Sequence, residues 1–304
     1  MENIYKPPRQ CEKFVAADRK FPRIPERSRD ASSCNGRPRA LQPASEYKGG
    51  SEMKRIVSLL AWICFPAGMA FAQQTFYFPQ VADGRDPGGT THWHTTIFLS
   101  NQSGSVASGT VTMYQSSGSA MNISFVDDLG AAAAVANHIT FQIPAGQTRK
   151  YTSVASGNLL VGYAVVTANV PIAGNAMFAH WTNPPGESLI GEAGVPAASL
   201  MSKQAVFADT QYGFNTGVAI ANPGTSSASI TLDLVGRDGQ VVASTTQTLG
   251  AGQHIARFTT ELFGAIDAMA GRLQISSSIP VAAMALRFDS RLEKFTTTFP
   301  FTVP

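Results

Sequence analysis

The chain has 304 residues, of which 44% are hydrophobic and 14% are charged, with 23 Lys and Arg against 20 Asp and Glu and a formal net charge of +3. This apolar fraction is typical of a globular protein with a packed core and excludes a chain that is disordered throughout. Residues 73–304 alone contain 10 Lys and Arg and 13 Asp and Glu, a net charge of −3. Because this part has no basic excess to neutralise a phosphate backbone, no nucleic-acid partner is predicted.

Residues 1–52 differ in composition from the rest of the chain. They are rich in Arg, Lys and Pro, with 11 Lys and Arg against 7 Asp and Glu, and they lack periodic apolar positions. Low hydrophobicity combined with such charge predicts disorder. A basic nucleic-acid tail is an alternative interpretation. We expect translation to start at Met53, so that this segment forms no part of the folded protein.

Residues 53–72 have the pattern of a secretory signal peptide. Met53-Lys54-Arg55 is a short basic region, Ile56 to Phe65 is an apolar stretch too short to span a bilayer, and Ala70-Phe71-Ala72 supplies a small-x-small cleavage pattern. The mature chain then begins at Gln73 and is not membrane-spanning. The predicted location is outside the cytoplasm: periplasmic, at the cell surface or extracellular. An internal hydrophobic strand is the alternative.

All cysteines lie before this cleavage site, at positions 11, 34 and 64. A lipid anchor on Cys64 is disfavoured, because the bulky Trp62 and Ile63 stand where a lipoprotein signal needs small side chains. The mature protein is therefore expected to have no disulfide and no thiol ligand. Its domains must be held together by the burial of apolar side chains alone.

The second half of the chain repeats the first. Thr95–Asn101 (TTIFLSN) corresponds to Thr216–Asn222 (TGVAIAN), and three further landmarks recur in the same order. These are Ala145-Gly146-Gln147 with Ala251-Gly252-Gln253, Gly162 with Gly271, and Val170-Pro171-Ile172 with Ile279-Pro280-Val281. The period predicts two tandem copies of one domain, residues 73–198 and 199–304.

Short runs of alternating apolar and polar residues fill both copies, such as residues 97–100 and 230–234. Period-2 alternation predicts strands with one face on a core. With six to eight such strands per copy, we predict two antiparallel β-sandwiches, with a barrel as the alternative. Asp238-Gly239 predicts a hairpin with a type I′ turn, and residues 260–269 one or two helical turns.

Turn-forming residues occupy equivalent places in the two copies. Asn101 and Asn222 each end an apolar run, where an Asn side chain bonds to nearby backbone, so we interpret this pair as turn chemistry. Pro171 and Pro280 are expected where one strand turns over into the last strands of each copy. Residues 193–199, small and containing one Pro, are predicted to be the linker.

His92-Trp93-His94 is the local cluster that suggests a metal ion. On a strand, imidazoles at i and i+2 share a face and can chelate a transition metal, with His138 or His180 as a third ligand. The alternative is a solvated loop in which only Trp93 packs. This alternative is favoured, so no metal and no cofactor are predicted and the two histidines stay weak candidates.

Support for an enzyme is weaker. Residues 186–191 (GESLIG) are one residue too long for the G-x-S-x-G nucleophile motif. Glu187 and Glu192 form a conceivable acid/base pair, but they flank a Pro/Gly loop and are expected to face water. A secreted metal-dependent or serine hydrolase is therefore kept as the alternative function.

Aromatic side chains near predicted loops or strand ends favour a binding function. Trp93, Trp181 and Tyr212 are the candidate binding residues, because exposed aromatic rings stack on sugars or on a partner protein. The alternative interpretation is that these rings close the ends of the sandwich.

The order of strands and turns in each copy resembles uncharacterised secreted tandem β-sandwich proteins of soil-type bacteria. Each copy is also similar to the β-sandwich domain of the sensory rhodopsin transducer family. This likeness lies in residues 218–222 (VAIAN), 278–281 (SIPV) and 286–291 (LRFDSR), and it implies the fold rather than a function. The transducer is a single intracellular domain that assembles as an oligomer, so a rhodopsin partner is not carried over.

Together these observations predict a non-enzymatic exported binding or structural module. Its partner is expected to be a glycan or an envelope protein. Self-assembly into an oligomer through exposed sheet edges is the third alternative.

Overall fold

The computed structural model describes residues 73–291 and 293–303. The segment 1–52 and the signal peptide 53–72, both predicted above, lie outside the described residues. The described part is nearly all β, with one short α-helix, α1 (Thr259–Phe263), and a single-turn 3-10 helix at Gln211–Gly213. None of its helices is long and apolar enough to cross a membrane.

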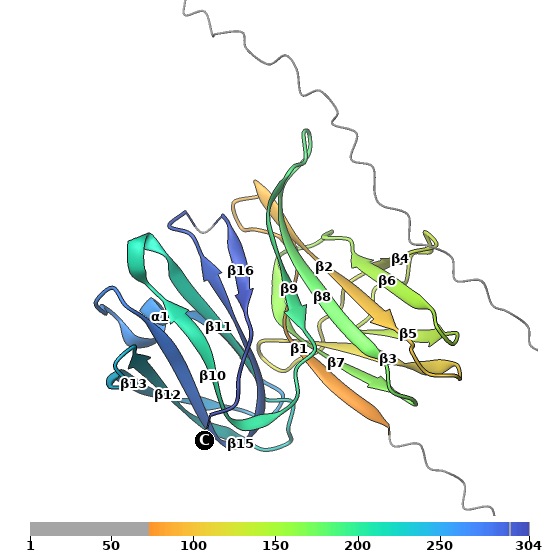
Figure 1. The fold of residues 1–304 in the computed structure, drawn as a ribbon. Coiled ribbons are helices and arrows are strands. Elements are labelled where there is room, and N and C mark those ends of the chain that lie inside the picture. Colours follow the sequence, from red (N-terminus) through yellow and green to blue (C-terminus); the bar gives the residue numbers. More distant parts are fainter. Residues whose placement is uncertain (1–72, 292, 304) are drawn as a thin grey trace, which may run out of the picture. The chain divides into compact units, whose positions relative to one another are not determined.

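The first half forms one antiparallel sheet of nine strands that curls into two layers (Figure 1). In one layer β7 pairs with β1 and β3, and β3 pairs with β5. In the other layer β2 pairs with β6 and β8, β6 with β4, and β8 with β9. Strand β1 joins the layers, because its last residues pair with β2. The bounds are β1 (Gln74–Arg85), β2 (Thr91–Ser100), β3 (Ala107–Gln115), β4 (Phe125–Asp127), β5 (His138–Ile143), β6 (Thr148–Ser153), β7 (Leu160–Ala168), β8 (Ala173–Thr182) and β9 (Leu189–Pro196).

The second half forms a separate antiparallel sheet of seven strands (Figure 1). The first part of β15 pairs with β10 and β12, and its last part pairs with β11 and β16. Strand β13 adds to β12, and β14 adds to β11. The bounds are β10 (Met201–Asp209), β11 (Asn215–Ala221), β12 (Ala228–Gly236), β13 (Val241–Leu249), β14 (His254–Phe258), β15 (Ala270–Phe288) and β16 (Phe295–Thr298).

The two halves share most of their strand pairings, although the first has nine strands and the second seven, and this confirms the predicted fold of tandem antiparallel sandwiches. Strands β10 and β12 pair with the first part of β15 as β1 and β3 pair with β7, and β11 pairs with the last part of β15 as β2 pairs with β8. The layers of the first half are joined by the β1–β2 pairing, whereas those of the second are joined by β15, which runs through both. Pro171 lies between β7 and β8, and Pro280 lies within β15 between its two sets of partners. Each proline therefore occupies the crossover from one layer to the other, where a missing N–H is tolerated.

Equivalent polar side chains make the same backbone hydrogen bonds in both halves. Thr95 Oγ1 donates to Ala82 O and accepts from Ala82 N, and Thr216 does the same with Asp209. Asn101 and Asn222 are fully buried, and their amides donate to the carbonyls that end neighbouring strands. The predicted turn chemistry of the asparagines is confirmed.

Close backbone approach explains the repeated glycine. A Cβ at Gly162 would overlap the carbonyl oxygen of Tyr114, and one at Gly271 would overlap that of Val235. Both glycines lie on a strand that has a partner on each side, so any side chain there would push the neighbouring strand away.

The core is continuous between the two halves. Alternation is clearest in β5, where Ile139, Phe141 and Ile143 are buried and the residues between them are exposed. Apolar side chains of the first sheet pack in one cluster with Met284, Leu286 and others from the second. A separate cluster fills the second sandwich. The described residues accordingly belong to one compact unit.

Three local predictions are corrected or refined. Residues 193–196 are the end of β9, with Val195 fully buried, so the predicted linker shortens to the residues before β10. The β12–β13 hairpin forms, but only Gly239 has a positive φ, so its turn is not type I′. The predicted helical turns shorten to α1.

Candidate metal centre

His92 and His94 lie on the same face of strand β2. His92 is buried and His94 is half-buried, and their rings meet edge to face with centroids 4.7 Å apart. At the two histidines, β2 is paired with β8 along one side and with the end of β1 along the other. The loop alternative for these two histidines is therefore wrong: they stand on a backbone fixed by hydrogen bonds.

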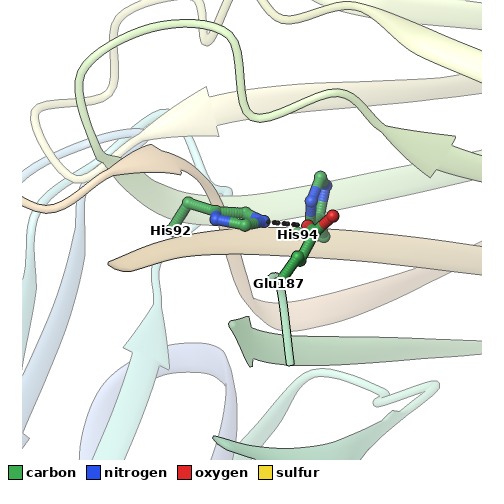
Figure 2. Close-up of side chains that lie close together, drawn as sticks. All are labelled: His92, His94 and Glu187. Atoms are coloured by element: carbon green, nitrogen blue, oxygen red, sulfur yellow. Dashed lines mark ion pairs between the residues drawn. The ribbon is translucent and has the colours of Figure 1, made fainter. Parts of the chain in front are cut away.

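A carboxylate that the sequence did not connect with them completes the cluster. Glu187 lies in the turn between β8 and β9, and its Oε1 is 2.8 Å from His92 Nε2 (Figure 2). One donor atom from each of His92, His94 and Glu187 lies within 4.8 Å of the others. The Glu187 side chain is 46% exposed against 6% for His92, so the cluster opens to solvent on the Glu187 side.

Hydrogen bonds fix which nitrogen each ring offers. Asn183 Nδ2 donates to Gly89 O at 2.6 Å, which turns its Oδ1 toward His92 Nδ1 at 2.7 Å. His94 Nδ1 lies 2.6 Å from the carbonyl oxygen of Ser153. Both partners only accept, so both Nδ1 atoms carry a proton and donate. Nε2 is then the nitrogen of each ring left for a metal, the arrangement that metal-binding histidines adopt. In His92 this atom lies 2.8 Å from Glu187 Oε1, so a metal ion would take the place of the proton shared between them.

A second carboxylate lies behind the two rings. Asp83 on β1 is buried and accepts a hydrogen bond from Ala155 N at 2.9 Å. Burial raises the pKa of the Asp83 carboxyl, against hydrogen bonds from Ser153 and Ala155 and the nearby imidazoles, which lower it. In its ionised form this carboxylate favours positive charge at the cluster.

The other face of β2 excludes the third ligands that the sequence suggested. Trp93 stacks on His180 with ring centroids 4.0 Å apart, and its Nε1 donates to Asp86 Oδ1 at 3.1 Å. Burial lowers the pKa of His180, against the raising effect of Asp86. His138 is exposed on β5, in the opposite layer. Neither His138 nor His180, the third ligands considered for a metal, lies with the pair, and Glu187 takes that place.

The three aromatic candidates lie in different surroundings. Trp181 is half-buried on β8 and is the cross-strand partner of His92, so it lies on the face of the histidine pair. Trp93 packs against the core on the opposite face. Tyr212 is 92% exposed in the loop before β11, in the second half. Only Trp181 adjoins the cluster.

Two imidazoles and one carboxylate suit zinc and other divalent transition metals. The cluster needs only small movements to take an ion, since metal bonds of about 2.0–2.2 Å place neighbouring donors somewhat more than 3 Å apart. Three protein ligands leave at least one coordination position for an outside donor. The second half has Gly213-Phe214-Asn215 at the equivalent place, so the cluster belongs to the first half alone.

A Ser–His pair with catalytic geometry is not found among the described residues. The one hydrogen bond there between a serine hydroxyl and a histidine ring joins Ser116 Oγ to His254 Nδ1 at 3.0 Å. His254 is only 2% exposed, and burial lowers its pKa to about 4, so it is inaccessible and a poor base. No model of a known protein family matches the chain, and no curated protein is significantly similar to it.

Proposed function

We propose that the protein is an exported, non-enzymatic binding module whose ligand site is a divalent transition-metal centre formed by His92, His94 and Glu187. The observation that carries this proposal is the hydrogen bonding at the back of the two rings. Both Nδ1 atoms donate to fixed acceptors, so Nε2 of each ring is the nitrogen left for a metal, and in His92 it already faces the Glu187 carboxylate at 2.8 Å. Export rests on the signal-peptide pattern of residues 53–72.

The proposed partner is a glycan or an envelope protein that supplies the remaining metal ligand. A hydroxyl or carboxylate oxygen can fill a position that the three side chains leave open. Trp181 supports a glycan in particular, because an indole on the face of His92 can stack on a sugar ring while a sugar oxygen binds the metal.

Binding to a glycan array and to envelope extracts tests this proposal. Zinc-loaded protein should bind, and chelation of the metal or the variant His94→Ala should abolish the signal. Trp181→Ala should weaken glycan binding while leaving zinc bound. His138→Ala is the matched control, because that histidine is exposed in the opposite layer. Binding that survives both chelation and His94→Ala, or no binding by the zinc-loaded protein, contradicts the proposal.

A metal-dependent hydrolase is the second candidate. Two histidines and one glutamate are also a donor set of catalytic zinc sites, which keep a position for water. Such a site needs a general base within reach of the metal-bound water. Asp83, the carboxylate behind the rings, is buried and held by Ala155 N–H, which favours the binding module. Hydrolysis of ester, peptide or phosphoester substrates that His94→Ala abolishes would favour the enzyme instead.

A further inference from the structure

A cavity of about 540 Å³ lies between the two sheets, and it forms no part of the function proposed above. Its first wall comes from β1, β2, β7 and β8, and its second wall from β11, β14 and β15. This volume falls within the range of about 300–1,000 Å³ that small-molecule sites occupy. The two halves thus create a concave site that neither sandwich provides alone.

The walls of the cavity are mainly apolar. Phe178 and Val161 line it from the first half, and Met284, Leu286 and Phe288 from the second. The cavity is open to solvent at its rim, and water against the apolar walls has few hydrogen-bond partners. A ligand with an apolar body would therefore be favoured over water.

One buried amide at the lining lacks a complete set of partners. The Gln80 side chain lines the cavity and is 6% exposed, and its Oε1 has no hydrogen-bond partner. An unpaired buried amide oxygen is unfavourable, so Gln80 Oε1 points to a water molecule that donates to it from inside the cavity.

A cation without an ion-pair partner stands at the rim. Arg257 on β14 is exposed and lines the cavity, and among the described residues no carboxylate lies within 4.0 Å of its guanidinium. Two carboxylates also line the cavity, and both accept hydrogen bonds from the chain. Glu261 accepts from Phe258 N at 2.7 Å, which caps α1, and Asp86 accepts from Trp93 Nε1 at 3.1 Å and from Thr91 Oγ1. The rim therefore presents a guanidinium that is free to bind an anion.

We propose that this cavity binds an anionic amphiphile, a carboxylate with an apolar tail of fatty-acid type. Arg257 binds the carboxylate through charge-assisted hydrogen bonds, and the tail lies against the apolar walls. Trp93 lines the same cavity, so its fluorescence provides a signal for an occupied site.

Titration of the full chain with dodecanoate tests this proposal by calorimetry and Trp fluorescence. We expect one molecule per chain, and we expect dodecyltrimethylammonium, with the same tail and the opposite charge, to bind at least about ten-fold more weakly. Arg257→Gln should weaken dodecanoate binding about ten-fold. Arg237→Gln should leave it unchanged, because that arginine lies in the exposed β12–β13 turn.

A cavity-filling variant gives a second, independent measurement. Ala219 is 6% exposed and lines the cavity, so Ala219→Phe should abolish the fluorescence response while circular dichroism stays that of the wild type. If Ala219→Phe does not fold, the dodecanoate affinity of the surface variant Arg257→Gln tests the proposal instead. Absence of saturable dodecanoate binding, or equal binding of the cationic amphiphile, would overturn the proposal, as would an affinity that Arg257→Gln does not change.

Discussion

The hydrogen bond between Asn183 and His92 provides a sharp test of the metal centre, because Asn183 itself is not a ligand. Its Oδ1 accepts from His92 Nδ1 at 2.7 Å, and Gly89 O holds the amide in that orientation. In Asn183→Ala the buried Nδ1–H loses its acceptor, which costs about 1–3 kcal/mol, and nothing then selects Nε2 for the metal. We expect zinc affinity to fall about 10–100-fold, which corresponds to about 1.4–2.7 kcal/mol.

The assay is competition for zinc against a colorimetric chelator at constant pH. Asn122→Ala is the control, because Asn122 is exposed in the loop before β4. Asn183→Asp keeps an acceptor for Nδ1 and should retain zinc affinity within a few-fold. If Asn183→Ala binds zinc as the wild type does while folding normally, the reasoning on the two Nδ1 atoms is wrong.

Three further predictions concern the ligand set and the stability of the fold. Glu187→Gln should weaken zinc binding by more than about ten-fold in the same competition assay. Glu192→Gln, on the same hairpin, should leave zinc affinity unchanged. If the two variants bind zinc equally well, Glu187 is not a ligand. Burial lowers the pKa of His254 to about 4, below the value of about 6.5 expected in the unfolded chain. The free energy of unfolding should therefore be unaffected by this histidine above about pH 6.5 and should decrease as the pH falls from 6.5 toward 4. The decrease from His254 is at most about 3 kcal/mol. In His254→Gln, the free energy of unfolding measured with denaturant should therefore decrease less steeply between about pH 6.5 and 4 than in the wild type. The same pH dependence in both proteins would refute this. Asn222→Ala leaves the buried carbonyl of Leu249 without its donor and should cost about 3 kcal/mol, or about 6–12 °C in calorimetry. Asn101→Ala should lower the same single transition, because the halves share a core; two separate transitions would contradict that.

Much of the fold could be predicted from the sequence because the repeat places the same constraints twice. Asn101 and Asn222 end equivalent strands, and Gly162 and Gly271 lie at equivalent close approaches, so each pair supports the other. The sequence predicts a linker at residues 193–199 because small residues with one Pro are typical of a connection between domains. In the structure, their first four residues form the end of β9. Short apolar side chains such as Val195 fit a buried strand equally well.

The continuity of the core could not be predicted from the repeat. Met284 and Leu286 pack into the cluster of the first sandwich, although the alternation in β15 indicates only that they are buried somewhere. Which sheet covers them depends on contacts between halves, and a repeat period contains no information on those contacts.

Two of the three residues of the candidate site could be predicted from the sequence. Spacing at i and i+2 placed His92 and His94 on one face, but it did not reveal that Glu187, 93 positions beyond His94, lies beside them. In the structure Trp181 is the cross-strand partner of His92, so the turn that follows Trp181 and contains Glu187 lies near the histidines. That register depends on the pairing of β2 with β8, which no local pattern encodes. The likeness to the transducer family stays a prediction.

The metal content of the purified wild-type protein tests the central claim most directly. After equilibration with zinc and removal of free metal, elemental analysis should find about one equivalent per chain, and His94→Ala prepared in parallel should contain almost none. A wild-type protein that retains no more zinc than this variant would contradict the account.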